Sequence, residues 1–170
     1  MCYSENMEST PLVDCRQHPP MPVRVYADTS VYGGVFDPGI DAASEAFLAQ
    51  VNAGRFQLVV SPVVVDELQD APERVRQVYE EHLPWAEFTD VSVEVVRQRD
   101  GYLQAGVVTP KWATDALHVA LATTHHCRCI VSWNFRHIVH PDKISLRNGV
   151  NLINGFDSIN TPAKVIAYET

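Results

Sequence analysis

The stretch "VRVYADTSVYGG", from Val23 to Gly34, passes from residues that favour a buried strand directly to an aspartate. Asp28 follows the predicted strand and precedes two hydroxyl residues and a glycine pair. An aspartate in this position has two interpretations. It caps the helix that follows, or it binds a ligand or metal ion, because α/β proteins commonly hold these at the carboxyl ends of strands. Asp28 alone does not separate the two, so its partners must be sought elsewhere in the chain.

Predicted strands and helices alternate after this stretch. The patterns predict strands at 23–27, 55–61 and 127–133, a short strand within 87–93 and, as an edge strand, 151–156. They predict helices at 41–54, 62–70, 72–83, 92–106, 112–126 and 161–169. Strands separated by helices imply right-handed crossovers and a mostly parallel sheet with both faces covered. The expected fold is therefore a single three-layer α/β/α domain.

Several capping and turn residues support this assignment. Ser61 followed by Pro62 is the expected N-cap and first residue of one helix. Asp41 is expected to cap another helix that Gly54 ends. Gly33 and Gly34 are expected to let the chain turn sharply after the first strand.

The first residues differ from the rest of the chain. Residues 1–21 are polar and rich in proline, so we predict a disordered leader and a folded domain at 22–170. If translation starts at Met21, the natural protein lacks this leader. The leader lacks the basic start and apolar core of a signal peptide. No apolar run approaches the roughly 18 residues of a membrane span. We therefore expect a cytoplasmic protein that does not enter a membrane.

The composition is acidic, with 13 Lys and Arg against 21 Asp and Glu, a formal net charge of −8. This charge argues against nonspecific binding of nucleic acid through a general basic surface. It does not exclude a nuclease, because a bound divalent cation inverts the local charge.

The run "HHCRC", residues 125–129, contains four potential zinc ligands. Its spacing is not that of a zinc site, which requires a more distant second pair. In a strand, Cys127 and Cys129 lie on the same face, and free cysteines are commonly buried. We interpret both as core residues.

Acidic and amide side chains occur at one edge of the predicted sheet. Asp28 ends the first strand, Asp115 lies in the first turn of an apolar helix, and Asn134 follows the last core strand. Strand ends and helix starts meet at one edge of a parallel sheet, where Glu67 can approach from its own helix. These oxygen donors would repel one another without a cation, and they suit Mg²⁺ or Mn²⁺.

Each of these residues also has a structural interpretation. Asp115 lies where the helix dipole favours an acid, and Glu67 fits a solvated position. His118, one turn after Asp115, is interpreted as a packed or hydrogen-bonded residue rather than a general base. Trp112 and Trp133 are consistent either with stacking on nucleobases or with core packing.

Four motifs occur in order along the chain: "YADTSVYGG", "SPVVVDEL", "TDALHVA" and "IVSWNF". Together they resemble the PIN-domain family of metal-dependent ribonucleases, and most of all the VapC-type toxins of bacterial toxin–antitoxin pairs. The resemblance extends from Val23 to about Glu169. It implies hydrolysis of RNA phosphodiester bonds, a small antitoxin partner that inserts side chains near the acidic cleft, and a homodimer.

The resemblance also assigns residues. It places Asp28, Glu67 and Asp115 at the three acidic positions of the family, with Asp28 and Asp115 as principal ligands of Mg²⁺ or Mn²⁺. Glu67 is then a ligand through water or a general base. Asn134 occupies the position where many relatives have a fourth acid. It would fix a water molecule or supply a ligand oxygen, and its missing charge would weaken a second metal site.

The resemblance also implies residues with supporting and substrate-binding roles. Ser30 matches a small hydroxyl position beside the metal in the family, and Ser132 is expected to act in the same way. Arg136 and Lys143 closely follow Asn134 and are the predicted phosphate contacts for RNA.

Other classes fit less well. A haloacid-dehalogenase-like phosphatase has a second aspartate where this chain has Ser30. A dinucleotide-binding domain has a G-x-G-x-x-G turn, which the first motif lacks. A catalytically idle PIN-like module that binds an antitoxin or another protein stays an alternative, favoured by Asn134 and by the acidic net charge.

Overall fold

The computed structural model describes residues 21–161 and has an all-parallel sheet of four strands at its centre. The strands are β1 (Val23–Ala27), β2 (Phe56–Val60), β3 (Ala86–Phe88) and β4 (Cys129–Val131). Their order across the sheet is β3-β2-β1-β4. In register, Val25 of β1 is opposite Leu58 on one side and Cys129 on the other. The predicted parallel α/β fold is therefore confirmed.

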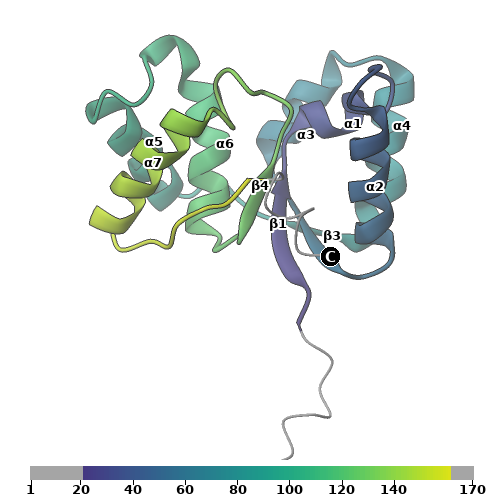
Figure 1. Ribbon diagram of the computed structural model, residues 1–170, viewed down its shortest axis with the longest axis horizontal. Helices are drawn as coiled ribbons and strands as arrows, with labels where there is room; N and C mark the ends of the chain where they lie inside the picture. Colours follow the sequence, from purple (N-terminus) through teal and green to yellow (C-terminus); the bar gives the residue numbers. More distant parts are fainter. Residues whose placement is uncertain (1–20, 162–170) are drawn as a thin grey trace, which may run out of the picture.

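Helices cover both faces of the sheet, as Figure 1 shows. One side carries α1 (Thr29–Gly34), α2 (Asp41–Asn52), α3 (Pro62–Gln69) and α4 (Glu73–His82). The other carries α5 (Val93–Gln104), α6 (Ala113–Thr124) and α7 (Pro141–Ile153). Short 3₁₀ turns, η2 (Leu83–Trp85) and η3 (Pro110–Trp112), lead into β3 and α6.

The core forms where this sheet meets the helices. The last three residues of both β1 and β2, and all of β4, are buried, as expected for strands covered on two faces. The thiols of Cys127 and Cys129 are also buried, and burial raises the pKa of each to about 12. Both cysteines are therefore unreactive core residues, as the sequence indicates.

The predicted edge strand at 151–156 is wrong, because its first residues complete α7. Pro141 begins that helix, and the buried side chain of Asn151 faces α5. The Oδ1 atom of Asn151 accepts hydrogen bonds from Gln98 Nε2 at 2.8 Å and from the Tyr102 hydroxyl at 2.5 Å. The chain reaches the edge of β4 later, at Asn160, through an isolated parallel bridge to Cys129.

The prediction of a sharp turn at the glycine pair is also wrong, because Gly33 and Gly34 end helix α1. A Cβ atom on Gly34 would lie 2.4 Å from Ser44 Oγ and 2.7 Å from Trp133 Nε1. Close approach to α2 and to the loop after β4, rather than backbone freedom, therefore requires glycine at Gly34.

Of the other residues predicted to begin or end helices, some have the expected position and one does not. Ser61 and Pro62 begin α3 as predicted. Ile40 is the N-cap of α2, and Asp41 lies inside its first turn. Gly54 has a positive φ of 72° just beyond that helix, as its predicted role requires.

The leader at 1–21 and the predicted helix at 161–169 lie almost entirely outside the described residues. Between residues 21 and 161, no helix combines the length and apolar character needed to cross a bilayer.

Candidate functional site

Asp28 is buried at the carboxyl end of β1, with only 4% of its surface exposed. Its Oδ1 atom accepts hydrogen bonds from Ser30, from the backbone N at 3.2 Å and from Oγ at 2.5 Å. Its Oδ2 atom accepts a hydrogen bond from Ser132 Oγ at 2.8 Å. Asp28 is thus the N-cap of α1, and the capping interpretation is confirmed. Ser30 and Ser132 both lie beside it, as predicted.

The environment of Asp28 disfavours its charged form. Burial raises the pKa of this carboxyl, and His118 and the two serine hydroxyls offset the effect only in part. Within residues 21–161, the groups that lower this pKa are His118 and the two serines, and no lysine or arginine is among them. A buried carboxylate is costly when no lysine or arginine compensates its charge, so a bound cation would relieve the cost.

A chain of hydrogen bonds connects Asp28 to Asp115. Ser132 Oγ, which donates to Asp28, accepts from the backbone N of Asn134 at 3.0 Å. Asn134 Nδ2 donates to Asp115 Oδ1 at 2.9 Å, and Asn134 Oδ1 accepts from the backbone N of His137 at 2.9 Å. Asp28, Asn134 and Asp115 therefore lie on one edge of the sheet, as its topology predicts.

Glu67 reaches the same edge from α3. His118 Nε2 lies 3.1 Å from Glu67 Oε1, and Thr29 Oγ1 donates to Oε2. Partial burial acts to raise the pKa of Glu67, but the hydrogen bond and charge of His118, together with Thr29, lower it below its usual value. Glu67 also raises the pKa of Asp28, so the two carboxyls interact.

These residues supply the oxygen donors that Mg²⁺ and Mn²⁺ prefer, and the buried carboxylate of Asp28 fits a cation. The types of donor atom suit these cations, but the carboxyl groups are not gathered around one point. Among residues 21–161, no three His, Cys, Asp or Glu side chains form a group able to hold a metal ion. Instead, Ser132 and Asn134 connect Asp28 with Asp115, and His118 contacts Glu67. The histidines and cysteines of the "HHCRC" run, residues 125–129, likewise form no such metal-binding group.

The aromatic side chains near the site are engaged within the protein. Trp112 stacks on His137, with ring centroids 3.6 Å apart and planes at 20°. The indole N–H of Trp133 donates to Ser44 Oγ at 2.8 Å. Both tryptophans are therefore structural in part, whereas Phe135, which follows Asn134 directly, is 58% exposed.

The two predicted phosphate contacts flank this segment. Arg136 is exposed. Lys143 is half-buried, with its Nζ 3.4 Å from His137 Nδ1. Both follow Asn134 in sequence, so their segment borders the edge that carries the carboxyls.

Sequence reasoning missed Tyr26 and Thr29 as members of the site. The Tyr26 hydroxyl lies 2.8 Å from His118 Nδ1, and Thr29 donates to Glu67. A signal for Tyr26 was present, because alternate residues of a strand share a face and Tyr26 precedes Asp28 by two. No comparable signal identified Thr29.

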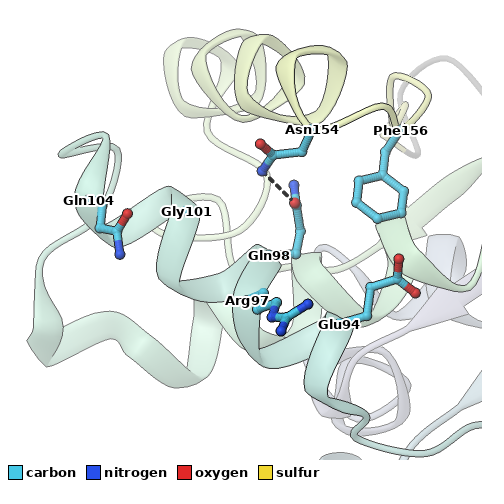
Figure 2. A pocket seen from close by; sticks show the side chains of 7 residues that line it. All are labelled: Glu94, Arg97, Gln98, Gly101, Gln104, Asn154 and Phe156. Carbon is cyan, nitrogen blue, oxygen red and sulfur yellow. Dashed lines mark hydrogen bonds between the residues drawn. The ribbon is translucent and has the colours of Figure 1, made fainter.

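A pocket of about 420 Å³ lies elsewhere, between α5 and the segment after α7. Figure 2 shows Gln98 on its floor, where Gln98 Oε1 accepts a hydrogen bond from Asn154 Nδ2 at 2.8 Å. Its lining residues are Glu94, Arg97, Gln98, Gly101, Gln104, Asn154 and Phe156. None of the candidate carboxyls contributes to it, so it is separate from the candidate site.

No protein-family model matches this chain, and no curated protein matches it. Among solved structures, it is similar to the crystal structure of VapBC2 from Rickettsia felis bound to a DNA fragment from their promoter. The match has a TM-score of 0.53 and 14% sequence identity, and it covers 82% of this chain and 98% of the other. At this identity the likeness is one of fold, and it agrees with the PIN-like architecture expected from the motifs.

Proposed function

We propose that this chain is a Mg²⁺- or Mn²⁺-dependent ribonuclease of the PIN-domain kind and the toxin of a type II toxin–antitoxin pair. The observation behind this proposal is the buried carboxylate of Asp28, which has no lysine or arginine partner within residues 21–161 and is connected by hydrogen bonds to Asp115. The PIN-like fold and the VapBC2 neighbour support the same class.

In this proposal, Asp28 and Asp115 are the principal metal ligands. Ser30 and Ser132 hold both oxygens of Asp28 in place, and Asn134 orients Asp115. When bound, the metal ion supplies a Lewis acid that lowers the pKa of water and neutralises phosphate charge.

Glu67 has the role of the base in this scheme. Its lowered pKa keeps the carboxylate ionised at neutral pH, so it can accept a hydrogen bond from a water molecule and orient it. Its partial exposure, 37% of the side chain, leaves it accessible to substrate and solvent.

The proposed substrate is RNA. Because the chain carries a net charge of −8, its phosphate contacts must be local. Arg136 and Lys143 are the proposed contacts, and the exposed ring of Phe135 offers a surface on which a base can stack.

The proposed partners follow from the same assignment. An antitoxin protein would cover the acidic edge, and the chain would form a homodimer in the cytoplasm. The neighbour supports an antitoxin partner, since VapBC2 is itself a two-component assembly by name.

A catalytically idle binding module is the second candidate. Asn134 removes a charge at the acidic edge, and residues 21–161 contain no preformed group of three metal-ligating side chains of the His, Cys, Asp or Glu type. An idle module would not bind Mn²⁺ with an affinity that depends on Asp28.

The deciding experiment is RNA cleavage by purified protein with Mg²⁺ or Mn²⁺, with chelator, and with Asp28→Asn and Asp115→Asn. Asp66→Asn, on the exposed face of α3, is the matched control. Several structured RNAs should be offered. Cleavage that requires metal, disappears in both site variants and persists in the control supports the nuclease.

Other outcomes redirect the assignment. Cleavage that survives both substitutions rejects this site. If no RNA is cut, titration with Mn²⁺ separates the two candidates: binding that depends on Asp28 indicates an untested RNA target, and its absence favours the idle module.

A further inference from the structure

We propose that His118 is a positioning residue that fixes the Glu67 carboxylate at the edge of the candidate site, with Tyr26 holding the imidazole. The inference rests on the proposed function, since it assigns a role in that reaction. It concerns a residue that touches no substrate itself and acts through Glu67.

Both nitrogens of His118 are engaged inside the protein. The side chain is 2% exposed, and its Nδ1 and Nε2 lie 2.8 Å from the Tyr26 hydroxyl and 3.1 Å from Glu67 Oε1. A carboxylate only accepts hydrogen bonds, so Nε2 carries a hydrogen and donates it. Nδ1 is then paired with the Tyr26 hydroxyl, which can donate to a neutral ring or accept from a charged one.

The chain of hydrogen bonds continues beyond Tyr26. Its hydroxyl lies 2.8 Å from Ser61 Oγ, and Ser61 is fully buried at the end of β2. The imidazole is therefore anchored by two adjacent strands, β1 and β2, before it reaches Glu67. This anchoring sets both the position of the ring and the nitrogen that faces the carboxylate.

Glu67 requires such support more than the other carboxyls do. Asp28 is held by two serines, whereas Glu67 has a longer side chain that is 37% exposed on α3. A free glutamate has several rotatable bonds and loses side-chain entropy when it is fixed in one conformation. His118 from α6 and Thr29 from α1 each bind one of its oxygens, so the carboxylate is fixed from two other helices.

The location of His118 on α6 connects Glu67 to Asp115. Residues three apart on a helix lie on the same face, so His118 and Asp115 face the same side of α6. A single helix thus carries one proposed metal ligand and the residue that positions the proposed base. Any displacement of His118 would change the separation of Glu67 from both Asp28 and Asp115.

The test compares steady-state RNA cleavage by His118→Leu, His118→Gln and the wild type. Leucine keeps an apolar volume but removes the donor, and kcat is expected to fall about 10–100-fold with KM unchanged. Glutamine places an amide N–H near the position of Nε2 and is expected to restore most of the loss. His82→Gln, at a buried histidine on α4, is the matched control and is expected to keep wild-type kinetics.

Tyr26→Phe keeps the ring of Tyr26 and tests the anchor if His118→Leu fails to fold. It is expected to lower kcat by a smaller factor, again with KM unchanged. A folded His118→Leu or Tyr26→Phe protein with wild-type kcat overturns the proposal. So does a His118→Gln protein no more active than His118→Leu.

A second readout does not depend on cleavage. In the wild-type protein, nitrogen NMR of His118 is expected to show a slowly exchanging proton on Nε2, which is lost in Glu67→Ala. If the wild type cuts no RNA and shows no Asp28-dependent Mn²⁺ binding but this signal behaves as expected, the proposed function fails while the contact itself stands. If the proton exchanges freely in the wild type, His118 does not hold Glu67 and the positioning role is rejected.

Discussion

Asn134 Nδ2 donates a hydrogen bond to Asp115 Oδ1 at 2.9 Å, so an amide meets a carboxylate at the position where the resemblance to PIN domains implies a fourth acid. An aspartate at Asn134 would place two like charges at this contact. Asn134→Asp is therefore expected to destabilise the metal-free protein by about 1–3 kcal/mol and to strengthen Mn²⁺ binding. Chemical denaturation in chelator and titration calorimetry measure the two effects. Asn52→Asp, at the exposed end of α2, adds the same charge elsewhere and controls for it.

Asp28→Asn is expected to stabilise the metal-free protein while it abolishes cleavage. The substitution removes a buried charge that has no lysine or arginine partner, and the amide oxygen can still accept from Ser30. Stabilising substitutions at functional sites typically contribute about 0.5–2 kcal/mol. Thermal unfolding of both proteins in chelator measures the difference, with Asp66→Asn as the surface control. A less stable Asp28→Asn protein contradicts the assigned environment of this carboxyl.

The raised pKa of Asp28 predicts how the stability of the metal-free protein depends on pH. The folded protein holds the Asp28 proton more tightly than the unfolded chain does, because burial raises the pKa of this carboxyl above its ordinary value of 3.8. Its contribution is fully present below that value and is lost as pH rises through the raised pKa. Glu67 acts in the opposite direction, since its lowered pKa adds stability above its usual value of 4.5. Subtraction of the Asp28→Asn profile from that of the wild type isolates the Asp28 effect in metal-free buffer.

Two glycines offer a matched test of packing near the site. Gly34→Ala places a Cβ atom 2.4 Å from Ser44 Oγ and 2.7 Å from Trp133 Nε1, so about 1–3 kcal/mol of stability is expected to be lost. Gly149→Ala on α7 meets nothing within 4 Å and is expected to stabilise that helix by about 0.5–1 kcal/mol. Urea denaturation of both variants measures this contrast. Equal effects would show that the contact at Gly34 relaxes freely.

Arg136→Ala and Lys143→Ala test the proposed phosphate contacts. Each is expected to raise KM for RNA and leave kcat nearly unchanged. Each is also expected to reduce the slope of log affinity against log salt concentration by about 1, the value for one lost phosphate contact. Arg74→Ala on α4 controls for a general loss of positive charge. Unchanged KM and salt dependence in both variants would place the RNA on another surface.

The sequence pattern predicts the sheet and the relative placement of Asp28, Asp115 and Asn134, because strand ends in a parallel sheet converge whatever the side chains do. The sequence pattern fails where tertiary contacts determine the secondary structure or the residue type at a position. Asn151 belongs to a helix because its amide accepts from α5, and Gly34 belongs to α1 because α2 lies against it.

The hydrogen bonds between side chains of the site could not be predicted either, because they join residues that are far apart in the sequence. Nothing local in "DALHVA" shows that His118 lies between Tyr26 and Glu67, which come from different elements. A strand pattern identifies Tyr26 as buried but does not identify the atom its hydroxyl meets.

The position of β1 between β2 and β4 has a consequence for protein synthesis. Asp28 meets Ser132 across 104 residues of chain, and its backbone N donates to Val131 O at 3.2 Å. While the ribosome is still elongating the chain, β1 and β2 can pair, but β4 has yet to emerge and both sides of the acidic edge cannot be present together. The contacts of Asp28 with Val131 and Ser132 can therefore form only after β4 has left the exit tunnel and docked beside β1, so the candidate site is assembled last.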